Sequence, residues 1–275
     1  MTAPSTDTHA AARVAAVQMV STPIVRENLD AASQLISKAA ESGAGLIALP
    51  EYFCFMGQKD HDKLAVRETA GAGPIQEFLS AQARQYGIYL VGGTLPLASP
   101  DAMRVYNTSM VYGPDGKLVA RYDKIHLFNF KRGAEAYDES IAIRPGTEVR
   151  VFDAPFGRIG LSVCYDVRFP ELYRALGQVD LILVPAAFTY TTGRAHWELL
   201  LRTRAIENQC YVLAPAQGGV HPNGRRTWGH SMLIDPWGDV VEVLPEGPGV
   251  VGGNIDGSRL NEVRAALPAL RHRVM

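Results

Sequence analysis

The sequence lacks the features that mark several large classes of protein. No apolar run approaches the ~18 residues that a membrane-spanning helix needs. Basic and acidic residues are nearly balanced, 27 against 28, so we expect no surface that follows a nucleic-acid backbone. Residues 1–12 are small and polar, contain no apolar signal core, and are predicted to form a mobile tail. We therefore expect a small-molecule partner, and neither nucleic acid nor membrane.

Cysteine is scarce, and the common metal-binding motifs are absent. The three cysteines, Cys54, Cys164 and Cys210, show no pairing pattern. This is typical of a reducing compartment and predicts a cytoplasmic location. Neither CxxC nor HExxH occurs, so we expect no metal site and no cofactor.

What the sequence does contain is an alternation of apolar strands and amphipathic helices. Strands are predicted at residues 14–19, 45–50, 88–92, 181–185 and 211–215, and helices at 26–41, 74–86 and 196–208. Residues 109–120 and 231–242 are predicted hairpins around Pro-Asp-Gly and Pro-Trp-Gly turns. A similar hairpin in each half predicts an α/β fold with pseudo-two-fold symmetry. No linker interrupts the pattern, so we expect one domain over residues 13–275.

Cys164 lies where a buried strand turns toward a helix that opens at Pro170, a residue suited to the first helical turn. A thiol near a helix N-terminus favours a reactive thiolate. A lone cysteine, however, is more often a small apolar core residue. Glu51 and Lys124 also follow apolar strands, and ligands gather at the carboxyl ends of strands in α/β sheets. The spacing alone leaves open whether these three residues meet.

Three motifs around these residues resemble the signature boxes of the nitrilase superfamily of carbon–nitrogen hydrolases. They are LPE at 49–51, YDKIHL at 122–127 and GLSVCYD at 160–166, in the family's order. The resemblance covers almost the whole chain after the tail. It implies a four-layer αββα sandwich that forms a homodimer, with the basic residues 267–275 crossing to the partner subunit. It also implies a Glu51, Lys124 and Cys164 triad with Cys164 as the nucleophile.

The chemistry that the resemblance implies is amide hydrolysis through a thioester. Only a few per cent of a thiol with a pKa of ~8.5 is ionised at neutral pH, so Glu51 is expected to act as general base. Lys124 and the backbone N–H of Tyr165 are the expected donors to the oxyanion. Glu139, in the string YDES at 137–140, matches the box of a second glutamate that would hold Lys124. Asp138 is the competing candidate for that role.

The second half of the chain resembles the Nit branch of the superfamily. The matching strings are CYDVRFPEL at 164–172, AHWELLLRTRAIENQCY at 195–211 and GHSMLIDPWG at 229–238. This branch contains deaminated-glutathione amidase and omega-amidase, and the last two strings favour the former. The string PEYFCFMG at 50–57 departs from the animal and yeast pattern, and it borders the expected pocket. A substrate such as α-ketoglutaramate, a nitrile or a carbamoyl amine therefore stays open, as does a scaffold role without turnover.

A substrate with carboxylates needs cationic or hydroxyl partners. Arg168 is a candidate for a bidentate carboxylate contact, and the alternative is a salt bridge with Glu171. Phe188 and Thr189 are expected to wall the pocket, with Thr192 as a weaker candidate. Three other residues are expected to pack rather than to bind ligand: His126, His230 and Trp197.

Overall fold

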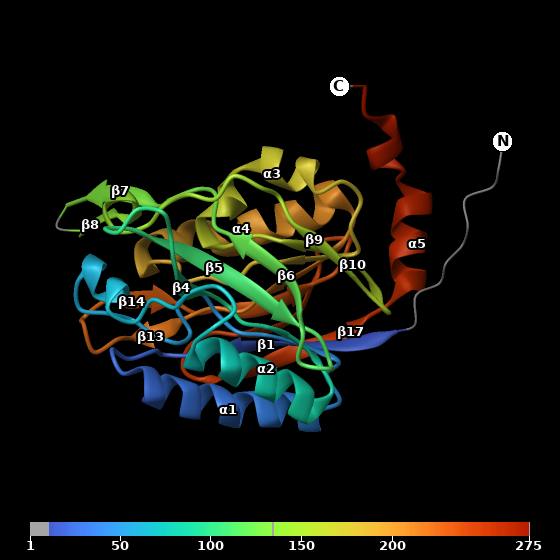
Figure 1. Cartoon of the computed structure of the whole chain (residues 1–275). Coiled ribbons are helices and arrows are strands. Elements are labelled where there is room, and N and C mark those ends of the chain that lie inside the picture. Colours follow the sequence, from blue (N-terminus) through green and yellow to red (C-terminus); the bar gives the residue numbers. More distant parts are fainter. Residues whose placement is uncertain (1–10, 134, 275) are drawn as a thin grey trace.

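Two β-sheets pack face to face at the centre of the computed structural model, which describes residues 11–133 and 135–274 (Figure 1). Residues 1–10 of the predicted tail lie outside the described residues, and the first strand begins at Ala12. The first sheet has the order β17 (Gly249–Ile255), β1 (Ala12–Gln18), β2 (Leu46–Ala48), β3 (Tyr89–Val91), β5 (Val105–Tyr112), β4 (Leu95–Ala98), with β6 (Leu118–Asp123) also paired to β5. The second has the order β16 (Val240–Leu244), β15 (Ser231–Ile234), β12 (Tyr211–Ala214), β11 (Leu181–Leu183), β10 (Gly157–Leu161), β9 (Val151–Ala154).

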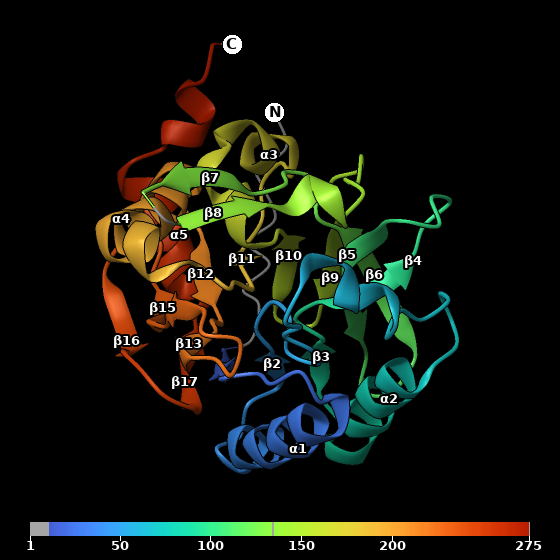
Figure 2. The ribbon, with the colours of Figure 1, turned by 90° about the vertical axis from the view of Figure 1, so that its left-hand side faces the viewer.

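Helices cover the outer face of each sheet. α1 (Val25–Glu41) and α2 (Pro74–Tyr86) lie on the first sheet, and α3 (Pro170–Ala175) and α4 (Tyr190–Asn208) lie on the second (Figure 2). β1 shows why the sheets are apolar on both faces. Val14 and Ala16 pack toward the second sheet, whereas Ala15 and Val17 pack with the residues of α1 and α2, because side chains alternate along a strand.

The two halves repeat one plan. β1, β2 and β3 are parallel and are followed by the antiparallel pair β5–β6. β10, β11 and β12 are likewise parallel and are followed by the antiparallel pair β15–β16. The αββα sandwich and its pseudo-two-fold plan are therefore confirmed.

Two small ribbons and several short 3₁₀ turns lie outside the sandwich layers. The ribbons are β7 (Asn129–Arg132) with β8 (Glu135–Asp138), and β13 (Gly218–Val220) with β14 (Arg226–Trp228). Both lie at the end of the molecule that faces the viewer in Figure 2. The 3₁₀ turns are η1 (Asp60–Leu64), η2 (Glu139–Ile141), η3 (Cys164–Arg168) and η4 (Ala269–His272).

The C-terminal part contains a helix that the sequence pattern did not indicate. α5 (Gly257–Ala266) is capped by Asp256, whose side chain accepts a hydrogen bond from the Ser258 N–H. α5 and the residues after it stand at one end of the sandwich and project beyond it (Figure 1). Among the helices of the described residues, none has both the length and the apolar character needed to cross a membrane.

Candidate active site

Glu51 follows β2 and is bound by groups from both sheets. Its side chain is 1% exposed. Oε1 accepts hydrogen bonds from Asn107 Nδ2 at 2.9 Å and from Lys124 Nζ at 2.8 Å. Oε2 accepts one from the Ala187 backbone N–H at 2.9 Å. Asn107 belongs to β5, and Ala187 follows β11, so one carboxylate links the two sheets at their carboxyl-end edge.

The chain near Glu51 depends on a close backbone contact. Gly93 has φ +47°, and a Cβ there would lie 2.0 Å from the Pro50 carbonyl oxygen, so only glycine fits. Tyr52 itself has φ +58°, and its N–H donates to Thr94 Oγ1 at 2.8 Å. A residue held in the left-handed region in this way is typical of a functional site.

Lys124 follows β6 and lies between two carboxylates. Its Nζ donates to Glu51 Oε1 at 2.8 Å and to Glu139 Oε2 at 2.8 Å, and its side chain is fully buried. Burial alone would lower the pKa of Lys124. The charges of Glu139 and Glu51 outweigh that effect and raise the pKa above its ordinary value, so the ammonium stays charged.

Glu139, at the start of η2, is the second carboxylate of this cluster. Besides Lys124, it accepts hydrogen bonds from the Tyr52 hydroxyl at 2.7 Å and from the Phe128 N–H at 2.7 Å. Burial would raise the pKa of Glu139, but Lys124 and these hydrogen bonds hold it below its ordinary value. Asp138 instead accepts from the Ser140 N–H and caps η2. The structure thus brings Glu139, and not Asp138, to Lys124.

Cys164 begins η3 directly after β10, with φ +50°. Its N–H donates to the Pro185 carbonyl at 2.9 Å, which fixes the turn against the end of β11. The residue is 7% exposed, and it lines a narrow cavity together with Glu51 and Glu139. The three strand-end residues of the sequence analysis therefore meet in space.

The sequence favoured a reactive thiolate at Cys164, whereas the structure favours the protonated thiol. Burial, followed by the charge of Glu51, raises the pKa of the thiol well above its usual value, and a hydrogen bond with Glu51 acts in the same direction. Lys124 opposes the shift but does not reverse it. At neutral pH the resting site therefore holds a protonated thiol beside a carboxylate that can accept its proton.

The residues expected to form the pocket wall lie around this cavity. Phe188, Thr189 and Thr192 line it, as does Tyr165, the residue expected to supply a backbone donor to the oxyanion. Thr189 also caps α4, because its Oγ1 lies 2.8 Å from Thr192 Oγ1 and accepts from the Thr192 N–H at 3.4 Å. The two threonine hydroxyls are thus already paired with each other.

Arg168 packs over the wall of the cavity. Its guanidinium lies 5.3 Å from the ring centre of Phe188 and 5.7 Å from that of Tyr165. Its Nη atoms lie 3.3 Å from His196 Nδ1. Among the ion pairs of the described residues there is none between Arg168 and Glu171, so the alternative suggested by the sequence does not form. Burial lowers the pKa of Arg168.

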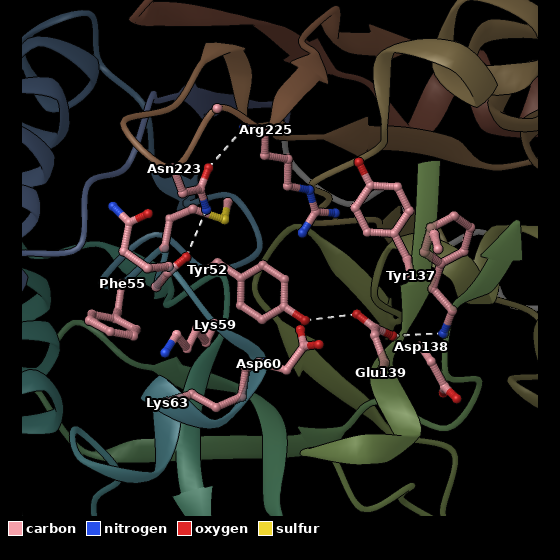
Figure 3. A pocket seen from close by; sticks show the side chains of 16 residues that line it. Tyr52, Phe55, Lys59, Asp60, Lys63, Tyr137, Asp138, Glu139, Asn223 and Arg225 are labelled. Carbon is pink, nitrogen blue, oxygen red and sulfur yellow. Dashed lines mark hydrogen bonds between the residues drawn. The ribbon is translucent and has the colours of Figure 1, made fainter. Parts of the chain in front are cut away.

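A larger cavity of about 410 Å³, whose lining Figure 3 shows, shares residues with the narrow one. Phe128, Glu139 and Arg225 line both cavities. Arg225 and Lys63 were missed in the sequence, as were Asn107 and Tyr52, which bind the two carboxylates. The Asn223-Gly224 pair in the turn between β13 and β14 is a hairpin signal that could have drawn attention to Arg225.

The remaining candidates are packed away from the cavity. His126 stacks on Phe169 with ring centres 3.7 Å apart and binds Asp166 through Nδ1 at 2.8 Å. His230 stacks on Trp228, and its carbonyl accepts from Trp197 Nε1 at 3.0 Å. Cys54 and Cys210 are buried. Over the residues that the structure describes, no group of His, Cys, Asp or Glu side chains is arranged to hold a metal ion.

Comparisons with known proteins identify the family of the chain. A family model described as Carbon-nitrogen hydrolase matches residues 13–265. The chain is 44% identical to a deaminated glutathione amidase of Synechocystis over 94% of this chain and 97% of that protein. It is 39% identical to omega-amidase NIT2 of Xenopus tropicalis, with 95% and 94% covered. The crystal structure of the C. elegans NitFhit protein matches with a TM-score of 0.88 and 39% identity over 96% of this chain, which spans 65% of that longer chain. The chain therefore belongs to the carbon–nitrogen hydrolase family and is a hydrolase of carbon–nitrogen bonds other than peptide bonds.

Proposed function

We propose that this protein is a cysteine-dependent amidase that cleaves deaminated glutathione to 2-oxoglutarate and cysteinylglycine. The observation that carries the proposal is that Cys164, Glu51 and Glu139 line one narrow cavity, with the buried Lys124 bound to both carboxylates. Relatives named for this activity, such as the Synechocystis protein, support the choice of substrate.

The first half of the reaction forms a thioester. Glu51 takes the proton of the Cys164 thiol as the sulfur attacks the amide carbonyl carbon. The carbonyl oxygen becomes an oxyanion, which the Lys124 ammonium and the Tyr165 backbone N–H stabilise, each donor contributing roughly 3–4 kcal/mol. The carbon–nitrogen bond then breaks, and Glu51 returns the proton to the leaving nitrogen. The acyl group remains on sulfur.

The second half releases the acid. Glu51 takes a proton from a water molecule, which attacks the thioester carbon, and the same donors stabilise the second oxyanion. The carbon–sulfur bond breaks and Cys164 recovers its proton from Glu51. Glu139 acts as a positioning residue throughout, because it holds Lys124 between two carboxylates.

Substrate binding is expected to use Arg168 for the carboxylate of the 2-oxo acid part. Its guanidinium lies against two residues of the cavity wall, and the described residues supply it with no carboxylate partner. Phe188, Thr189 and Thr192 would contact the carbon chain and the oxo group.

We also propose a cytoplasmic homodimer in which residues 267–275 contact the partner subunit. Leu267 is 49% exposed and Val274 is 95% exposed on the projecting segment, which leaves apolar surface for a partner. The described cysteines are all free and buried, which suits a reducing compartment. Met275 lies outside the described residues.

The test is a competition assay in which purified enzyme receives equal amounts of deaminated glutathione and α-ketoglutaramate, followed by mass spectrometry. Faster loss of deaminated glutathione, with release of 2-oxoglutarate and cysteinylglycine, is expected. Preferential loss of α-ketoglutaramate would assign the protein to omega-amidase activity, which relatives such as the Xenopus protein carry in their names. If neither compound is consumed, the proposed substrate is wrong. The Cys164→Ala variant serves as the blank.

A further inference from the structure

The large cavity has no role in the chemistry proposed above. It opens from the narrow cavity at Phe128, Glu139 and Arg225, and its volume of about 410 Å³ is within the usual range of small-molecule sites. The acyl part is the same in deaminated glutathione and α-ketoglutaramate, so it gives no reason for a second chamber. The leaving groups differ, because one is a dipeptide with a carboxylate and the other is ammonia. Only the dipeptide needs such a space.

Arg225 is fixed at the junction of the two cavities. Its backbone N–H donates to Asn223 Oδ1 at 2.9 Å, and Asn223 Nδ2 in turn donates to the Gly57 carbonyl at 2.7 Å. Its guanidinium lies 5.0 Å from the ring centre of Tyr137 and donates through Nη2 to the Ala187 carbonyl at 3.1 Å. Nε is buried without a hydrogen-bond partner. A half-buried guanidinium with an unused donor is suited to a carboxylate ligand.

Lys63 supplies a second cation to the same chamber. It lies on η1, and its Nζ is 5.9 Å from the ring centre of Tyr52, whose hydroxyl binds Glu139 (Figure 3). Within the described residues, neither Lys63 nor Arg225 has a carboxylate at ion-pair distance.

Burial lowers the pKa of Lys63, and the charges of Asp60 and Glu139 act against that effect, but no acidic residue among the described residues lies at ion-pair distance from Lys63 or Arg225. Both oxygens of Glu139 are already bound to Lys124, and each has a further donor. Asp138 is bound to Ser140, and Asp60 is exposed and lines the cavity as well. Lys59, which is exposed, also lines the chamber, and Lys63 and Arg225 are its two half-buried cations without an ion-pair partner among the described residues.

We propose that Arg225 and Lys63 bind the carboxylate of the amine leaving group, which is the glycine end of cysteinylglycine when deaminated glutathione is the substrate. The inference rests on the proposed function and assigns the two ends of that substrate to different cations. Arg168 binds the end shared with α-ketoglutaramate, and the Arg225–Lys63 pair binds the end that α-ketoglutaramate lacks. The Arg225–Lys63 pair therefore gives the protein a preference for amides whose leaving amine carries a carboxylate.

A purely structural role for Arg225 predicts something different. Arg225 bonds the Ala187 carbonyl, and the Ala187 N–H binds Glu51. If that link were its whole purpose, its loss would misplace Glu51 and lower kcat for every amide alike. A binding role instead raises KM, and only for substrates whose leaving group carries the carboxylate. Lys63 does not contact Ala187, so Lys63→Gln tests the same site without disturbing that link.

The experiment uses a matched pair of substrates, deaminated glutathione and its C-terminal glycinamide, which differ only in the leaving-group carboxylate. Steady-state kinetics are measured for wild type, Arg225→Gln, Arg225→Lys and Lys63→Gln. Arg226→Gln is the control, because this neighbouring arginine is exposed and pairs with Glu246 outside the chamber. Affinities for both compounds are measured in parallel by calorimetry with Cys164→Ala, alone and combined with Arg225→Gln, so that binding is observed without turnover.

We expect wild type and Arg226→Gln to favour the acid over the amide roughly tenfold or more, as for a charge-assisted hydrogen bond. Arg225→Gln should remove the preference, and Arg225→Lys and Lys63→Gln should reduce it. Equal wild-type turnover and affinity for acid and amide would overturn the inference and leave the proposed function standing. Equal loss of kcat for both compounds in Arg225→Gln, with the preference intact, would also overturn it. Failure to bind or cleave either compound would overturn both the inference and the proposed function.

Discussion

Lys124 and Glu51 form an ion pair of 2.8 Å whose two side chains are almost completely shielded from solvent. A buried charge that loses its partner is far more costly than the intact pair is favourable. The pair therefore ties the stability of the fold to the arrangement needed for chemistry.

Replacing Lys124 with alanine should both abolish turnover and destabilise the protein by about 3–5 kcal/mol, because Glu51 and Glu139 lose their shared cation. Urea unfolding monitored by circular dichroism gives the free energy. The control is Lys117→Ala, since Lys117 pairs with Asp115 on the surface at 2.9 Å and should have little effect. Equal stability of the two variants would contradict the buried-pair account.

Cys164→Ala should lower kcat by about 10⁶ while leaving the protein folded. Alanine has the same Cβ as cysteine, so the φ of +50° costs both residues the same strain. Activity assays and thermal melts measure the two effects separately. Retention of more than a tenth of the wild-type activity would exclude Cys164 as the nucleophile.

Glu51→Gln should lower the pKa of Cys164 and yet remove amidase activity. The carboxylate charge of Glu51 raises that pKa in the wild-type protein, whereas Lys124 lowers it. The rate at which iodoacetamide labels Cys164 can be followed by peptide mass spectrometry between pH 6 and pH 10. This rate should begin to rise at a lower pH in the variant than in wild type. If the rate rises over the same pH range in both proteins, the charge of Glu51 does not contribute to the raised pKa of Cys164.

Glu139→Gln should make the free energy of unfolding depend less on pH in the acid range. The folded-state pKa of Glu139 lies below its ordinary value of 4.5, so its ionised form contributes stability above that pH. The contribution is lost as pH falls through the lowered folded-state pKa. Denaturation at a series of pH values should show a smaller loss below pH 4.5 in the variant than in wild type. If the free energy of unfolding falls equally with pH in both proteins, Glu139 does not contribute to the loss of stability in acid.

Arg168→Lys should raise KM for substrates with a 2-oxo acid carboxylate more than for neutral amides. Lysine keeps the charge but loses the planar fork that makes two parallel hydrogen bonds. Deaminated glutathione and α-ketoglutaramate should be affected to similar extents, because they share the acyl end. An equal change for a neutral amide of the same length would exclude Arg168 from carboxylate binding.

The order of strands and helices could be predicted because their apolar patterns are strong and local. The start of α4 could not. The prediction began at residue 196, whereas the helix starts at Tyr190 behind the Thr189 cap. Gly193 argues against helix in the sequence. In the structure a Cβ at this position would lie 2.3 Å from Trp228 Cβ, so glycine serves a close contact that only the folded chain reveals.

The strand-end positions of Glu51, Lys124 and Cys164 suggested a site, but only the resemblance to a family indicated that these residues would meet. The choice between Asp138 and Glu139 depended on which side chain caps η2, a matter of one residue in register. Arg225 could not be assigned from sequence, because its position depends on how the β13–β14 ribbon docks beside residue Gly57 through Asn223.

Because Glu51 is bound by groups from both sheets, the geometry of the active site depends on how the two sheets pack against each other. Asn107 binds one oxygen from the first sheet, and Ala187, which is 136 residues from Glu51 in the chain, binds the other from beyond the second sheet. A slip of one sheet over the other by an ångström would separate the base from the thiol while most of the secondary structure survived. Catalysis should therefore fail at a lower temperature than circular dichroism reports melting, and neither half of the chain can be active by itself.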